Sequence, residues 1–118
     1  MKTKRRTARK IPIRGLVFQE GAWLSVRCLE YDQATQARTL PQLYKSLNRL
    51  ILGHIAVRLH HKQRPFASLP PAPRKYWDMF ERSRIPLSAH ATNVRSVRSN
   101  GFVVPPPELR VALEDSGL

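Results

Sequence analysis

The stretch from residue 39 to residue 60, TLPQLYKSLNRLILGHIAVRLH, constrains the fold more than any other part of the sequence. Apolar side chains recur in it at spacings of three and four, which places them on one side of a helix. They are Leu40, Leu43, Tyr44, Leu47, Leu50, Ile51 and Ile55. Thr39 and Gln42 have capping-box spacing, and Pro41 falls in the first turn, where a missing N–H is tolerated. The pattern predicts one long amphipathic helix that ends near His60 and needs an apolar surface to lie on.

Three strand-like segments precede this helix. Residues 11–18 are mostly apolar, and Glu20-Gly21 then marks a turn. In residues 22–29 apolar and polar side chains alternate, which is the period of a half-buried strand. Residues 34–38, ATQAR, form a short third candidate. A helix and a sheet that each carry one apolar face pack on one another. The expected fold is therefore α+β, with a small antiparallel sheet of three to four strands packed on one long helix.

The residues after the helix predict shorter elements in a proline-rich context. FASL, residues 66–69, is expected to be a closing strand beside the hairpin, and residues 74–83 a short helix with an aromatic face. Residues 109–113 have two interpretations, a docked helical turn or a segment ordered only by a partner. The expected organisation is a flexible basic arm (1–10), a β-β-β-α-β domain (11–72), a short helix (73–87) and a loosely ordered Pro-, Ser- and Arg-rich tail (88–118).

Positive charge dominates the sequence. Lys and Arg number 21 against 8 Asp and Glu, a formal net charge of +13. Between Asp32 and Asp78 there is no carboxylate at all. Such one-sided charge favours polyanionic partners, although long basic side chains also serve to cover apolar surface and keep a domain soluble. The candidate anion-binding or nucleic-acid-binding residues are Lys4, Arg5, Arg6, Arg38, Lys45, Arg49, Arg74 and Lys75.

Several function classes find no support in the sequence. Cys28 stands alone, so there is neither an internal disulfide nor a CxxC pair. No run reaches the roughly 18 apolar residues of a membrane span, and the basic N-terminus lacks the apolar stretch of a secretory signal. We therefore expect a cytoplasmic protein that does not contact a membrane.

Two groups of residues could in principle bind a metal or act in catalysis, three carboxylates and three histidines. Glu20, Glu30 and Asp32 lie near expected hairpin ends, where carboxylates are more often solvated than bound to metal. The histidines at 54, 60 and 61 have no cysteine or acid nearby to complete a site. No Ser–His–Asp set and no phosphate-binding glycine motif is present. We expect no catalytic residue, no metal site, no cofactor and no enzymatic activity.

One segment resembles a known family. GAWLSVRCLEYDQATQARTLPQLYKSLNRLI, residues 21–51, resembles the strand–turn–strand–helix pattern of the HicB family, the antitoxins of HicA–HicB toxin–antitoxin pairs. The direct matches are Thr35, Gln36, Thr39 and Leu40, followed by the helical core positions Leu43, Tyr44, Leu47 and Ile51. RPFASLPPAP, residues 64–73, resembles the closing strand and proline-rich exit of that domain. The resemblance covers residues 11–72.

The resemblance implies a partial RNase H-like fold and a role without catalysis. Such a module, expected to be a homodimer, binds and blocks a partner protein such as an mRNA-cleaving toxin. At four positions the sequence departs from the family pattern: Ala37 replaces a glycine, Arg38 an acid, and Pro41 and Gln42 two further acids. An alternative that the charge supports is a stand-alone basic accessory protein that binds DNA or RNA.

Overall fold

The computed structural model describes residues 9–87, 97–99 and 102–112. These residues form a mixed α+β fold with two helices and two sheets, one of five strands and one of three. In chain order the elements are β1 (Arg9–Lys10), β2 (Arg14–Glu20), β3 (Trp23–Cys28), β4 (Gln33–Ala37), α1 (Leu40–His60), α2 (Arg74–Arg82), β5 (Pro86–Leu87), β6 (Val97–Ser99), β7 (Phe102–Val104) and β8 (Glu108–Val111).

The hairpin predicted at Glu20-Gly21 is confirmed. Strands β2 and β3 pair antiparallel from Gly15–Cys28 to Glu20–Trp23. Gly21 has a φ of +62°, a left-handed conformation that glycine adopts without a Cβ penalty. Strand β4 then pairs antiparallel with β3, and the chain passes directly into α1. Thr39 is the N-cap of α1, and its hydroxyl accepts a hydrogen bond from the Gln42 N–H at 3.3 Å, as the capping pattern predicted.

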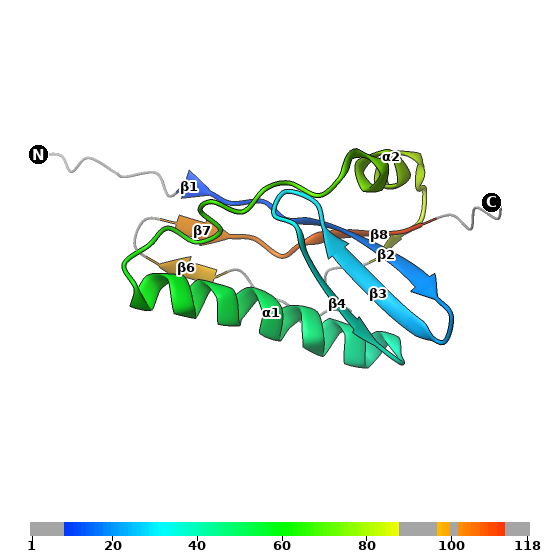
Figure 1. The fold of residues 1–118 in the computed structure, drawn as a ribbon, viewed down its shortest axis with the longest axis horizontal. Helices are drawn as coiled ribbons and strands as arrows, with labels where there is room; N and C mark the ends of the chain where they lie inside the picture. The colour runs from blue at the N-terminus through cyan, green and yellow to red at the C-terminus, as the bar shows by residue number, and fades with distance from the viewer. Residues whose placement is uncertain (1–8, 88–96, 100–101, 113–118) are drawn as a thin grey trace, which may run out of the picture.

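The two helices cover opposite faces of the five-stranded sheet (Figure 1). On one face the buried stripe of α1, with Leu43, Leu47 and Ile51, joins a core that includes Val17 and Val26. On the other face α2 packs against the sheet, in a cluster whose buried members are Leu16, Leu29, Ala72 and Phe80. The alternation of Leu16 and Val17 along β2 therefore supplies both cores.

The closing strand predicted at residues 66–69 is wrong. Phe66 and Ser68 have positive φ values of 63° and 71°, which no strand accommodates, and the segment is a turn. The Phe66 ring stacks between Tyr31 and His54, with centroid distances of 4.7 and 4.6 Å. The apolar side chain of Phe66, which suggested a strand, instead anchors this loop to α1.

The strand beside the hairpin is β8, which comes from the segment expected to be a loose tail. It pairs parallel with β2, from Arg14–Glu108 to Val17–Val111. The expectations of a helical turn or a partner-ordered segment at 109–113 are corrected for residues 109–111, which are strand. Short β5 pairs antiparallel with β8. The sheet thus has the order β4-β3-β2-β8-β5 and is mixed, where a purely antiparallel sheet of three to four strands was expected.

A second, small sheet joins the two ends of the described chain. Strand β1 pairs parallel with β7, and β6 pairs antiparallel with β7. Arg9 and Lys10, assigned to the flexible arm, are therefore strand residues, because the backbone pairs with β7 even though both side chains are exposed. Within residues 9–87, 97–99 and 102–112, neither α1 nor α2 is long and apolar enough to cross a membrane.

Gly15 lies where the sheet permits no side chain. A Cβ built there would stand 2.6 Å from Cδ2 of Leu109 and 3.1 Å from Cγ2 of Val26. We expect Gly15→Ala to lower the free energy of unfolding by about 1–3 kcal/mol through overpacking, measured by urea denaturation. The matched control is Gly53→Ala on α1, where a Cβ meets no atom within 4 Å. That change should stabilise by about 0.4–1 kcal/mol. Equal stability of the Gly15→Ala variant and the parent would contradict this packing.

His54 makes the stability depend on pH. Its Nε2 accepts a hydrogen bond from the Phe66 N–H at 3.0 Å, which requires the neutral ring. Burial, and secondarily the charge of Arg58, lowers the pKa of His54 from its usual 6.5. The unfolded chain then binds the proton more readily, so this contribution is present above pH 6.5 and is lost as the pH falls through the lowered folded pKa. We expect the melting temperature to fall as the pH is lowered from about 8 to about 5. Most carboxylates titrate below this range, so they contribute little to the change.

The control for this pH effect is His54→Gln, whose amide oxygen can accept the same hydrogen bond without titrating. The variant should show a flatter pH profile than the parent over the same range. Identical slopes for the two proteins would show that His54 does not cause the effect.

Candidate functional site: a basic groove at the sheet edge

Three of the predicted cations gather in one groove between the end of β4 and the exposed side of α1. The groove has a volume of about 350 Å³. Its lining residues, which together are called the basic groove below, are Trp23, Gln36, Ala37, Arg38, Gln42, Lys45, Ser46 and Arg49. None of these described lining residues is a carboxylate.

The local structure explains why these side chains converge. Arg38 precedes the N-cap, so it stands at the junction of β4 and α1. Its guanidinium carbon lies 4.3 Å from the centroid of the Trp23 ring, a cation–π contact. Lys45 and Arg49 are exposed on α1, while Leu43 and Leu47 of the same turns are buried against the sheet. Sheet packing therefore turns the two cations outward, next to the edge of β4.

The electrostatics of the groove are one-sided. The first turn of α1 contains no acidic residue, although acids are stabilising at a helix N-terminus. Four salt bridges are found among the described residues, and none of them includes Arg38, Lys45 or Arg49. Like charges four residues apart on a helix destabilise it by about 0.2–0.5 kcal/mol. An incoming anion would relieve this repulsion.

The other predicted cations lie elsewhere. Arg74 and Lys75 are on α2, across the sheet from α1, and Arg74 faces Asp78 at 3.9 Å. The Lys75 ammonium lies 5.0 Å from the Tyr76 ring. Lys4, Arg5 and Arg6 fall outside the described residues. The eight candidates are thus not gathered on one surface of the described protein: three share the groove and two belong to the other face.

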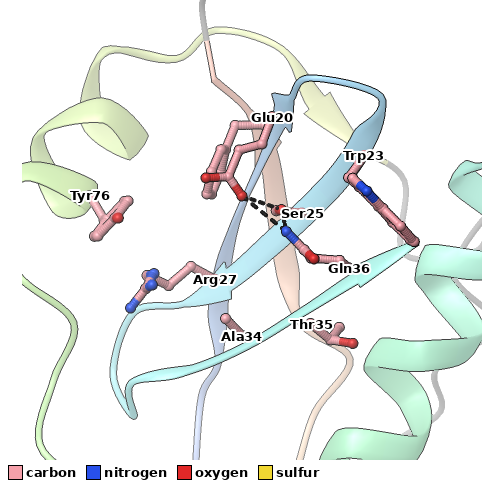
Figure 2. A pocket seen from close by; sticks show the side chains of 9 residues that line it. Glu20, Trp23, Ser25, Arg27, Ala34, Thr35, Gln36 and Tyr76 are labelled. Atoms are coloured by element: carbon pink, nitrogen blue, oxygen red, sulfur yellow. Dashed lines mark hydrogen bonds between the residues drawn. The ribbon is translucent and has the colours of Figure 1, made fainter. Parts of the chain in front are cut away.

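A second hollow, of about 500 Å³, lies on the face of the sheet that carries α2 (Figure 2). Glu20 Oε1 accepts hydrogen bonds from the Ser25 hydroxyl at 2.8 Å and the Gln36 amide at 3.2 Å. Arg27 pairs with Asp32 at 2.6 Å and stacks over the Tyr76 ring at 4.4 Å. These groups bind one another, so the hollow is polar and most of its charged groups already have partners, although the buried Arg27 Nε has none among the described residues. Gln36 and Trp23 line both the hollow and the basic groove.

The residues considered for metal binding have other contacts. Glu30 forms a salt bridge with Arg14 at 2.9 Å, and Asp32 with Arg27. Within residues 9–87, 97–99 and 102–112, no three His, Cys, Asp or Glu side chains are grouped so that they would hold a metal ion. Cys28 is buried, and this burial, with Glu30 and Asp32 nearby, raises the pKa of its thiol to about 12. The thiol therefore stays protonated at neutral pH and is a poor nucleophile.

Comparison with known proteins adds nothing to these observations. No family model, curated protein or solved structure matches the chain. The function must therefore be inferred from the fold and the basic groove themselves.

Trp23 is the member of the groove that the sequence did not single out. Strand alternation places it with Ser25 and Arg27, away from α1. Figure 2 shows it at the first residue of β3, beside the hairpin turn, with its ring extending toward the start of α1. Its exposure of 40% is high for so large an apolar side chain. The sequence did contain a signal for this role. Trp23 follows a predicted hairpin turn, and Arg38 directly precedes the predicted helix.

The charges of the groove should reduce stability. Replacing Lys45 by Glu removes the repulsion with Arg49 and creates an attractive pair in the favourable orientation, so we expect a gain of about 0.4–1 kcal/mol at low salt. Lys45→Gln, which removes only the repulsion, should give about half of that gain. Both effects should shrink in about 1 M salt, where the screening length is near 3 Å. Chemical denaturation measures the series; a loss of stability in Lys45→Glu would mean that Lys45 has a structural role.

Proposed function

We propose that the protein is a HicB-like interaction module that acts without catalysis and binds and blocks a partner protein, such as an mRNA-cleaving toxin. The observation that carries the proposal is the order of the elements. Three antiparallel strands lead through a capped turn into one long helix on the sheet, and a later strand, β8, completes the sheet beside β2. The strand–strand–strand–helix part of this order agrees with what the HicB resemblance implies. The closing strand expected at 66–69 is a turn instead, and β8 follows α2, β5, β6 and β7 in the chain.

The residues that carry the resemblance support the proposal as structural positions. Thr39 caps α1, and Leu43, Leu47 and Ile51 are buried on the sheet. Thr35 lies on β4, which feeds the helix. Fold-level likeness is a weak guide to function, because one fold hosts many functions. The proposed role therefore also draws on the exposed groove, a surface suited to an interaction, and on a buried, protonated Cys28 in place of a nucleophile.

The test is co-expression with the product of the neighbouring reading frame. We expect the two proteins to purify as a stoichiometric complex and expect this protein to relieve growth arrest caused by its neighbour. In the proposed role the protein acts in the cytoplasm as a homodimer, which sedimentation equilibrium of the purified protein tests. Failure to find a complex, together with no relief of toxicity, would rule out the antitoxin role.

Nucleic-acid binding is the second candidate, and the gathering of Arg38, Lys45 and Arg49 beside exposed Trp23 favours it. Each phosphate contact adds about 0.9 to the slope of log affinity against log salt on duplex DNA. Reversing Lys45 and Arg49 to Glu should therefore lower that slope by about 2, measured on DNA and RNA between about 50 and 200 mM salt. Arg74→Glu with Lys75→Glu is the matched control and should leave the slope unchanged if the groove is the contact. A slope that is equal in all three proteins would eliminate the groove as a nucleic-acid site.

A further inference from the structure

Strand β4 is an open edge of the five-stranded sheet. It stands at one end of the order β4-β3-β2-β8-β5. Within the part of the chain that the structure describes, no backbone hydrogen bond joins β4 to any element except β3. Along an edge strand, alternate residues direct their N–H and C=O groups outward, where they are ready to pair with another strand. Strand β4 therefore offers a backbone template.

The two edges of this sheet are not protected alike. At the far end, the described part of the chain has β5 as a strand of two residues, and one of them, Pro86, has no N–H to donate. Both features are usual means of preventing edge-to-edge pairing. Strand β4 has five residues, Gln33–Ala37, with no proline and no charge. The protection present at β5 is missing at β4.

The cations of the basic groove flank this edge. Arg38 follows the last residue of β4, and Lys45 and Arg49 lie on the neighbouring side of α1. These two are about 6 Å apart along the helix axis, since each residue rises 1.5 Å. Every second residue of a strand repeats at a comparable distance, about 6.6 Å. A strand added to β4 could thus place carboxylates at alternate positions near both cations.

The opposite face of the same edge has a different chemistry. There Gln36 and Glu20 meet, and the Glu20 carboxylate is already bound by Ser25 and Gln36. A second carboxylate beside Glu20 would be repelled. The residues of an added strand that face this hollow should be neutral. The two faces together specify an alternation of acidic and neutral side chains.

We infer that β4 and the basic groove form a docking edge for an extended acidic peptide segment of a partner protein, which adds as a strand to the sheet with its carboxylates on Arg38, Lys45 and Arg49. This inference rests on the proposed function and deepens it, because it specifies that the partner's binding segment is extended and acidic. It also agrees with the departure of this sequence from the family pattern, in which Arg38, Pro41 and Gln42 stand where that pattern has acids.

Other occupants fit less well. A second copy docked at this edge would bring its own Arg38, Lys45 and Arg49 to the same cations, so the homodimer of the proposed function would have to form through another surface. A nucleic-acid strand would neutralise the cations but would leave the backbone groups of β4 without partners in register. Arg74 and Lys75 lie across the sheet, so they do not extend the groove into a longer track for phosphates.

The test uses a fluorescein-labelled peptide of about eight residues in which Glu and Thr alternate, a length that spans β4 and a composition that favours strands. Fluorescence anisotropy measures its binding to the full chain. One control peptide carries Lys in place of Glu, and another keeps every Glu but has N-methylated amides at alternate residues, which removes the N–H donors without altering charge. We expect the Glu–Thr peptide to bind, the Lys peptide not to bind, and N-methylation to weaken binding about tenfold, equivalent to the loss of one or two net hydrogen bonds.

Two protein variants with equal change of charge locate the site. Lys45→Glu with Arg49→Glu should weaken the Glu–Thr peptide about tenfold or more, whereas Arg74→Glu with Lys75→Glu on α2 should change affinity by less than about threefold. Circular dichroism checks that both variants are folded. Amide chemical-shift changes in the parent protein on adding the peptide should centre on residues 33–37 and on the neighbouring turns of α1.

Four results of the binding and sedimentation experiments would overturn the inference. The first is that the N-methylated peptide binds as tightly as the Glu–Thr peptide, and the second is that the α2 variant weakens the Glu–Thr peptide as much as the groove variant does. The third is that a single-stranded oligonucleotide of the same charge binds the groove more tightly than the peptide. The fourth is that the protein sediments as a dimer that the peptide cannot dissociate and in which the β4 amides are protected. The inference and the proposed function fail separately. A complex with the neighbouring gene product that survives Lys45→Glu with Arg49→Glu refutes the docking edge alone. Absence of that complex refutes the antitoxin role while the peptide assay still decides the edge.

Discussion

Strand β2 is hydrogen-bonded along both of its sides and buried on both of its faces, and the other elements take their places from it. On one side it pairs with β3, and on the other with β8. Leu16 points to the α2 face and Val17 to the α1 face, so one strand serves both cores. Gly15 permits this arrangement, since Leu109 and Val26 occupy the space that a side chain would need. Apolar burial on two faces of a single strand is the arrangement that unites helices lying on opposite sides of the sheet.

The sequence predicted those elements whose signal is local. The helix that follows Thr39 has a cap, a proline in its first turn and an apolar stripe of several turns, so its type and bounds could be inferred. The first hairpin has a mostly apolar first strand, an alternating second strand and Gly21 between them. Strand β8 has no such signal: it is four residues long, follows three prolines and pairs in parallel with residues at the other end of the chain. The turn at Phe66 and Ser68 was misassigned because neither residue is one that usually announces a positive φ.

The candidate site divides in the same way. Helical periodicity indicated that Lys45 and Arg49 would be neighbours, and the junction with β4 brought Arg38 to them. The same charge pattern gave no means of separating Arg74 and Lys75, which tertiary structure places beyond the sheet. Trp23 was hidden by its place in an alternating strand, where an aromatic is ordinarily a packing residue. The charge pattern thus predicted three cations that share one groove, but only the fold shows which cations lie on which surface.

The parallel pairing of β2 with β8 has a consequence for how the chain is made. Synthesis runs from the N-terminus, so the hairpin and α1 emerge well before Glu108–Val111 exist to cover the second side of β2. During that interval the central strand of the finished sheet is itself an uncovered apolar edge, the kind of surface through which immature chains associate wrongly. Closing the sheet then depends on a contact between distant parts of the sequence, which is intrinsically slow. Protection of the nascent chain, by a chaperone or by an early-binding partner, would accordingly matter most just before its last strand appears.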